Sequence, residues 1–147
     1  RTTIASRCGL SAQADIVVDV SENIFDIVVT KLKPIDVIFV DEVQFFTCGQ
    51  IEQLRQITND LGIQIICYGL RVDFRNNLFD GSRRLFELAD EFVEVKSVCS
   101  YCNRKATCNM KCINGIPDLS GPTTQIGGDE AYRAVCYRCF TDKIKNS

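Results

Sequence analysis

Long apolar segments are missing from this sequence. No run approaches the roughly 20 apolar residues that a membrane-spanning helix requires, although 46% of the 147 residues are hydrophobic. The printed chain also opens without the charged segment and apolar stretch of a secretory leader. We therefore expect a cytoplasmic protein with no membrane partner.

An excess of positive charge is missing as well. The chain has 17 basic and 19 acidic residues, a formal net charge of −2 and a pI of about 5.2. This balance supplies no overall attraction for a nucleic-acid backbone or for an anionic membrane. We therefore expect a small-molecule or protein partner, and no nucleic acid.

A phosphate-binding loop of the form Gly-x-x-x-x-Gly-Lys-Ser/Thr is the third absence. The nearest glycine groupings, at Gly121 and Gly127, are not followed by lysine. The chain opens at Arg1, and no strand that could support such a loop precedes this residue. The printed residues therefore lack this cradle for nucleotide phosphates, and we expect the chain to be incomplete at its N-terminus.

Cysteine, by contrast, is frequent. Nine cysteines are an odd number, and several lie in apolar segments, which argues against a disulfide framework. Two pairs have Cys-x-x-Cys spacing, Cys99 with Cys102 and Cys136 with Cys139. Two such knuckles supply the four thiolates of a closed tetrahedral zinc site. Because no ligand position is left for water, we predict a structural zinc ion that ties the base of the loop between the pairs.

Other interpretations of the cysteines stay open. A Cys-x-x-Cys pair can also cycle as a disulfide, and pairs can arise by coincidence in a cysteine-rich chain. Cys108 or Cys112 can in principle replace a ligand, but their spacing lacks the knuckle geometry. We expect these two residues in a hairpin.

Alternating strand and helix patterns occupy most of the chain. Short apolar runs predict strands, and apolar residues at helical spacing predict helices that end near Pro34 and Gly62. A strand, a helix and a strand in succession form a βαβ crossover, typical of a parallel sheet with helices on its faces. The run 36–40 is almost wholly apolar, as in a strand buried on both faces. We predict strands over 15–20, 36–40, 63–68 and 92–98, and helices over 24–32 and 50–61.

An acidic pair, Asp41-Glu42, follows one predicted strand, and Gly69 follows the next. Ligands of parallel sheets bind beyond the carboxyl ends of the strands. At a nucleotide-phosphate site, an Asp in this place orients magnesium, and a neighbouring Glu takes a proton from an attacking hydroxyl or water. A strand ending in an ordinary acidic turn is equally common, so the pair needs its context.

That context is an ordered set of motifs. Asp-Glu-Val-Gln-Phe-Phe at residues 41–46 precedes Tyr-Gly-Leu-Arg-Val-Asp-Phe at 68–74 and Phe79; the two cysteine pairs follow, with Ile-Gly-Gly at 126–128 and Tyr132 before the second pair. In this order the motifs resemble the zinc-containing, tetrameric type of thymidine kinase over nearly the whole chain. The resemblance implies an α/β fold with a P-loop NTPase-like parallel sheet over residues 1–92, and a small zinc-ribbon-like lobe carrying a lasso loop over residues 93–147.

The resemblance also implies roles for individual residues. Glu42 matches the catalytic base that deprotonates the 5′-hydroxyl of thymidine as it attacks ATP, while Asp41 matches the acidic residue serving Mg²⁺, and Gln44 falls in the same motif. Matched apolar residues would line the thymine pocket, and the lasso would read the base mainly through main-chain groups. The implied thymidine-binding residues are Phe45, Leu70, Phe74, Phe79, Thr123, Thr124, Gln125, Ile126, Gly127 and Tyr132, and the zinc ligands are Cys99, Cys102, Cys136 and Cys139.

The expected activity is ATP-dependent phosphorylation of thymidine in nucleotide salvage, by a homotetramer. In the family the phosphate-binding loop precedes the region where this chain begins, so we expect the chain as printed to be inactive without it. The aromatic residues in the proposed pocket are also typical of a hydrophobic core. Two rival functions remain: a hydrolase in which Glu42 activates water, and a zinc-ribbon module that binds nucleic acid through basic residues of the second lobe. Those residues are Lys96, Arg104, Lys105, Lys111, Arg133 and Arg138.

Overall fold

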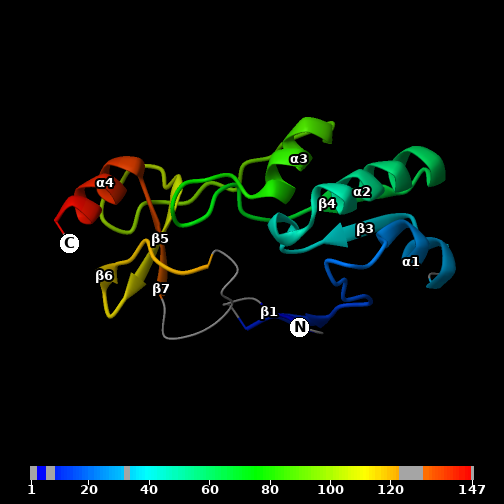
Figure 1. Cartoon of the computed structure of the whole chain (residues 1–147), viewed down its shortest axis with the longest axis horizontal. Helices are drawn as coiled ribbons and strands as arrows, with labels where there is room; N and C mark the ends of the chain where they lie inside the picture. Colours follow the sequence, from blue (N-terminus) through cyan, green and yellow to red (C-terminus); the bar gives the residue numbers. More distant parts are fainter. Residues whose placement is uncertain (1–2, 6–8, 32–33, 123–130, 147) are drawn as a thin grey trace.

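A computed structural model describes residues 3–5, 9–31, 34–122 and 131–146. The molecule is elongated, with α1, α2, α3, β3 and β4 toward one end and β5, β6, β7 and α4 at the other (Figure 1). No helix in these ranges is long and apolar enough to cross a membrane. The elements are β1 (Thr3–Ala5), β2 (Ser11–Gln13), α1 (Ile24–Lys31), β3 (Val37–Val40), the 3₁₀ turn η1 (Val43–Phe45), α2 (Cys48–Leu61), β4 (Gln64–Cys67), α3 (Asp80–Leu88), β5 (Cys108–Ile113), β6 (Ile116–Pro117), β7 (Ala131–Val135) and α4 (Tyr137–Lys145).

The predicted βαβ crossover is confirmed. β3 and β4 pair in parallel, with Val40 opposite Cys67 at their carboxyl ends, and α2 connects them. α2 begins with a capping box, in which the Thr47 side chain accepts from the Gln50 N–H and the Gln50 side chain accepts from the Thr47 N–H. It ends at Gly62, whose φ of 68° is the left-handed conformation that glycine adopts without strain.

The first hydrophobic core lies between the helices and one face of this small sheet. Apolar side chains of α1, α2 and β3 form the buried cluster, and Leu85 and Leu88 of α3 pack against it. Phe39, whose side chain points to the other face, is 63% exposed. The expectation that β3 is buried on both faces is therefore wrong within the described residues, because the helices gather on one side. The buried members are Ile24, Val28, Val40, Val43, Ile51, Leu54, Ile57 and Ile63.

Two other predicted strands are wrong. Residues 15–20 form no strand; Asp19 instead makes a tight turn in which its carboxylate accepts the N–H of Ser21. Gln50 of α2 fixes this turn by donating to the carbonyl of Asp19 at 2.7 Å. Residues 92–98 run as an exposed connection, with a single bridge at Val98, since no partner strand lies along the rest of this segment among the described residues.

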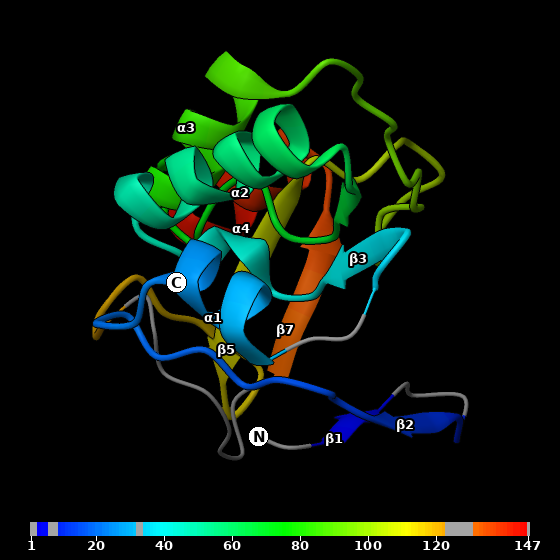
Figure 2. The same cartoon turned by 90° about the vertical axis from the view of Figure 1, so that its right-hand side faces the viewer.

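A second hydrophobic core holds the other end of the molecule. β5 lies between β6 and β7 in an antiparallel sheet, and α4 packs beside it. A turn with positive φ at Asn114 and Gly115 joins β5 to β6. Cys108 and Cys112 lie in β5 as predicted for hairpin residues, and both are buried in this core. The structure is thus a mixed α/β fold with small sheets, including a short β1–β2 hairpin that the sequence did not predict (Figure 2).

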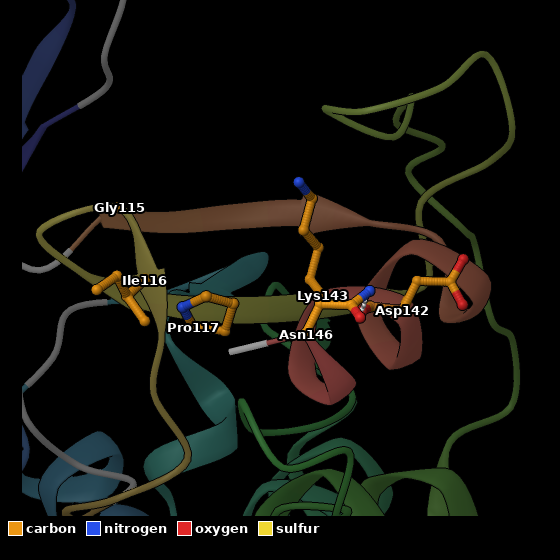
Figure 3. A pocket seen from close by; sticks show the side chains of 6 residues that line it. All are labelled: Gly115, Ile116, Pro117, Asp142, Lys143 and Asn146. Atoms are coloured by element: carbon orange, nitrogen blue, oxygen red, sulfur yellow. Dashed lines mark hydrogen bonds between the residues drawn. The ribbon is translucent and has the colours of Figure 1, made fainter.

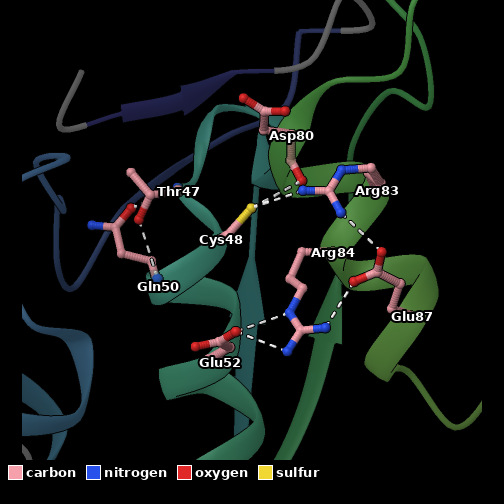
Figure 4. A network of polar contacts seen from close by, with 8 residues as sticks. All are labelled: Thr47, Cys48, Gln50, Glu52, Asp80, Arg83, Arg84 and Glu87. Atoms are coloured by element: carbon pink, nitrogen blue, oxygen red, sulfur yellow. Dashed lines mark hydrogen bonds and ion pairs between the residues drawn. The ribbon is translucent and has the colours of Figure 1, made fainter.

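Helix α3 is fastened to α2 and η1. Arg84 of α3 donates to Glu52 of α2 at 2.8 and 3.0 Å, and Glu87 accepts from both Arg83 and Arg84 (Figure 4). At its first turn, a Cβ on Gly81 would lie 2.5 Å from the Phe46 carbonyl oxygen, so only glycine permits this approach. These contacts fix the end of the loop that runs from β4 to α3.

Candidate functional site

The four predicted zinc ligands lie together. The Sγ atoms of Cys99, Cys102, Cys136 and Cys139 are all within 4.8 Å of one another. Cys102 Sγ lies 3.7 Å from Cys136 Sγ and 3.8 Å from Cys139 Sγ. Four sulfurs bound tetrahedrally at about 2.3 Å are separated by about 3.8 Å. The cluster is therefore close enough to hold a metal ion, and its spacing fits zinc.

Local hydrogen bonds favour the thiolate form of two cysteines in the cluster. Burial by itself raises the pKa of Cys99, but backbone N–H groups, including that of Tyr101, donate to its sulfur and lower the pKa to about 6. The N–H of Cys139 donates to the sulfur of Cys136 at 3.4 Å and lowers the pKa of Cys136. The pKa of Cys139 rises to about 12, because its thiol hydrogen-bonds to the sulfur of Cys136. Two of the sulfurs thus favour the charged form that binds metal.

The acidic pair lies at the carboxyl end of β3. Backbone hydrogen bonds hold the ends of the two parallel strands together there, from Tyr68 N to Val40 O and from Val43 N to Tyr68 O. The exposed Asp41 accepts the N–H of Glu42 at 3.0 Å. Glu42 is also exposed, and its φ of 52° and ψ of 37° place it in the left-handed region. This conformation turns the chain sharply between β3 and η1.

Gln44 connects this carboxylate with the next loop. Its side chain is 3% exposed. The amide nitrogen donates to Glu42 Oε2, and the amide oxygen accepts the N–H of Leu70 at 3.1 Å. Both ends of the amide are therefore used, and the loop after β4 is held beside Glu42. Gly69 permits the approach, since a Cβ there would lie 2.6 Å from Gln44 Oε1.

Part of the predicted apolar pocket gathers around this bridge. The rings of Phe45 and Phe79 meet edge to face at 5.8 Å. Leu70 is 45% exposed and its carbonyl accepts the hydroxyl of Ser82 at 2.6 Å, which ties it to α3. The structure thus brings Glu42, Phe45, Leu70 and Phe79 into one region, with an apolar surface beside a carboxylate.

Phe74 differs from these three residues. It is 2% exposed, and two cations lie near its ring, Arg75 at 4.7 Å and Lys111 at 5.2 Å from the ring centre. We predicted no role for Arg75 from the sequence, and Lys111 only among the basic residues of a rival nucleic-acid-binding surface.

One further predicted substrate residue, Tyr132, lies in the second lobe. Tyr132 is in β7, opposite Lys111 of β5, and is 39% exposed. The residues predicted to form the lasso contacts fall outside the described residues; they are Thr123, Thr124, Gln125, Ile126 and Gly127.

A surface hollow elsewhere on the second lobe does not resemble a reaction site. It lies between the β5–β6 turn and α4 (Figure 3). Its polar groups are used within the chain: Asn146 donates to the Asp142 carbonyl at 2.7 Å, and Lys143 lies over the Tyr101 ring. None of the predicted site residues lines it. The lining residues are Gly115, Ile116, Pro117, Asp142, Lys143 and Asn146.

Comparison with known proteins gives a consistent result. The sequence profile described as thymidine kinase matches residues 1–140. The thymidine kinase of Zymomonas mobilis is 40% identical over 146 residues, which cover 97% of this chain and 75% of that protein. The thymidine kinase of Encephalitozoon cuniculi is 36% identical over 148 residues, covering 99% of this chain and 69% of that protein. That of Lactococcus lactis is 39% identical over 139 residues, covering 94% and 72%.

Proposed function

The chain belongs to the thymidine kinase family, and from this premise we propose that it phosphorylates thymidine with ATP, giving thymidine monophosphate for nucleotide salvage. The observation that carries the site assignment is the bridge from Glu42 through Gln44 to Leu70. It joins a carboxylate at the end of a parallel strand to a loop with apolar surface. Such an arrangement suits a nucleoside with its 5′-hydroxyl near the carboxylate and its base against the apolar side chains.

Glu42 is the proposed general base, which takes the proton of the 5′-hydroxyl as that oxygen attacks the γ-phosphate. Gln44 supports this role, since its amide holds one carboxylate oxygen and leaves the other available. Asp41 lies next to the base and is the proposed acidic residue on the side of ATP and Mg²⁺. When bound, Mg²⁺ would neutralise charge that develops on the phosphates.

The thymidine site combines residues from both ends of the molecule. Phe45, Leu70, Phe74 and Phe79 supply apolar faces for a planar base. Tyr132 and residues 123–127 are proposed to complete the pocket from the second lobe. The four cysteines hold a structural zinc ion that fixes this lobe without taking part in the chemistry.

The proposed domains, oligomeric state and cellular compartment rest on the same family membership. Separate cores for residues 18–88 and 99–144 support a division into a P-loop NTPase-like core over residues 1–92 and a zinc lobe over residues 93–147. A homotetramer is proposed from the resemblance. Eight free cysteines among the described residues suit a reducing compartment such as the cytoplasm.

The rival functions have less support. Of the basic residues proposed for nucleic-acid contact, Lys111 is 2% exposed, while Lys105 pairs with Glu94 and Arg138 with Asp142. A simple hydrolase would not need the apolar surface beside Glu42.

The test is Glu42→Gln in the full-length protein. The amide keeps the shape of the side chain but cannot accept the proton, so we expect kcat to fall by at least about a hundredfold with thymidine binding nearly unchanged in calorimetry. The matched control is Glu91→Gln, which changes an exposed carboxylate away from the site. Turnover of Glu42→Gln within tenfold of the wild type would show that the base is wrong. Release of phosphate from ATP without thymidine would favour the hydrolase.

A further inference from the structure

Lys111 is a lysine in the interior of the second lobe. It lies in β5, and its side chain is 2% exposed. A buried ammonium group is costly unless it is paired and hydrogen-bonded. Its contacts therefore indicate what the structure gains from placing a charge there.

Three of its contacts involve residues 118–120 and Phe74. Lys111 Nζ donates to the carbonyl of Ser120 at 3.1 Å and faces Asp118 Oδ2 at 3.4 Å. The other oxygen of Asp118 accepts the N–H and hydroxyl of Ser120, which folds residues 118–120 into a compact turn. The same ammonium group lies 5.2 Å from the centre of the Phe74 ring.

Arg75 approaches the same turn from the loop after β4. Its Nε donates to the Leu119 carbonyl at 2.8 Å, and its Nη2 donates to the Gly121 carbonyl. Three consecutive carbonyls, those of residues 119–121, thus accept hydrogen bonds from two cations. These cations also lie against Phe74, at 4.7 Å for Arg75. We call this set the cation clamp: Lys111, Arg75, Phe74 and residues 118–121.

The clamp connects parts of the chain that the two hydrophobic cores do not connect. Phe74 is buried but belongs to neither core cluster. Its place is fixed by the clamp and by the turn around Asp73, whose carboxylate accepts the N–H groups of Arg75 and Asn77 at 2.9 Å. Removal of the positive charge of Lys111 or Arg75 should therefore shift residues 70–79 without unfolding either hydrophobic core.

We propose that Lys111 and Arg75 are positioning residues for the nucleoside site, which hold the loop 70–79 of the first lobe against the turn 118–121 of the zinc lobe. This proposal rests on the proposed function, because Leu70, Phe74 and Phe79 are the thymidine-binding residues of that loop. Lys111 and Arg75 act through Phe74 and the loop, not on the phosphates. Their removal should weaken thymidine binding more than the chemical step.

The variant that tests this is Lys111→Met, which keeps the length and apolar packing of the side chain but removes the charge. We expect the KM for thymidine to rise at least about tenfold, as for a lost charge-assisted hydrogen bond, with kcat within threefold and the KM for ATP unchanged. Arg75→Ala should act in the same direction, and Lys111→Arg should restore most of the affinity. Lys105→Met is the matched control, since Lys105 lies in the same lobe and pairs with the exposed Glu94.

Two further readouts keep the outcomes distinct. Zinc content should stay at one per chain in Lys111→Met, and amide exchange should accelerate in residues 70–79 and 118–121 while α2 and β5 stay protected. An unchanged KM and unchanged exchange would overturn the proposal, as would a loss of zinc together with a general loss of kcat, which would mean a purely structural lysine. If the wild type lacked thymidine kinase activity, the proposed function would fail, and the exchange data would still decide whether the clamp exists.

Discussion

The side-chain amide of Gln44 donates a hydrogen bond to the carboxylate of Glu42. Gln44 is buried and Glu42 is exposed, so a side chain in the interior orients a side chain on the surface. The other end of the same amide accepts the N–H of Leu70. One side chain therefore contacts both the proposed base and the loop after β4, which carries the proposed thymidine-binding residues.

Gln44→Leu should lower kcat by about tenfold to a hundredfold, since a hydrogen bond to a charged group contributes about 1.5–3 kcal/mol. The free energy of unfolding should also fall, because the N–H of Leu70 loses its partner. Steady-state kinetics and urea unfolding measure the two effects. Gln56→Leu, which removes an exposed amide of α2, is the control and should change neither. Normal kcat in Gln44→Leu would show that Glu42 does not need the hydrogen bond from Gln44 for turnover.

Two glycines should respond in opposite ways to alanine. At Gly69 a Cβ would lie 2.6 Å from Gln44 Oε1 and 2.9 Å from Val43 Cγ1, so Gly69→Ala should displace the bridge and reduce kcat. At Gly49, the second residue of α2, the nearest atom to an added Cβ would be Thr47 Oγ1 at 4.0 Å. Gly49→Ala should therefore stabilise the protein by about 0.5–1 kcal/mol, through the better helix propensity of alanine. Thermal melts and kinetics on both variants test the contrast; equal effects would contradict it.

Removal of one of the proposed zinc ligands should unfold the second lobe alone. Cys136→Ser takes away a ligand and also the sulfur that accepts the Cys139 N–H. Structural zinc supplies about 10–16 kcal/mol of binding free energy in small domains, so we expect loss of metal by elemental analysis and loss of amide protection in β5 and β7. Cys48→Ser changes a cysteine near Arg83 of α3. This variant should keep both the metal and the amide protection of β5 and β7. Retained zinc in Cys136→Ser would point to another ligand set.

The fold and the site were predictable to different degrees. The crossover and the end of α2 follow from local signals, since apolar spacing and Gly62 predicted a helix over 50–61, whereas the structure begins this helix at Cys48 after the capping box at Thr47. The cysteine cluster follows from two matched spacings. The predicted strand at 15–20 failed because the side chains of Asp19 and Gln50 fix a turn there, and Gln50 lies in a different element.

The cation clamp was not predictable from local patterns. Arg75 and Gly121 are far apart along the chain, and no periodicity relates them. A basic residue in a strand usually indicates an exposed face, which is how Lys111 was interpreted. Its burial becomes visible only when residues 118–121 and Phe74 close around it.

The Glu87 carboxylate should give a measurable pH dependence to stability. Its hydrogen bond from Arg84, with the nearby Arg83, lowers its pKa below the ordinary value. A folded pKa that is lower than the unfolded pKa stabilises the protein above the unfolded value of about 4.3, and this contribution is lost as pH falls through the folded value. Glu87→Gln should therefore lower the urea midpoint slightly at pH 7, and the difference from wild type should shrink below about pH 4. A pH-independent difference between Glu87→Gln and the wild type would contradict the assignment.

Glu42 stands in the left-handed region, with φ 52° and ψ 37°. For a residue with a Cβ, that conformation costs about 1–2 kcal/mol, whereas glycine adopts it freely. Glu42→Gly should therefore relieve strain at the same position where it removes the proposed base. Selection for heat resistance should therefore favour glycine at position 42, whereas selection for turnover should favour glutamate. A library of residue 42 sorted once by thermal tolerance and once by growth that depends on thymidine salvage should return different amino acids.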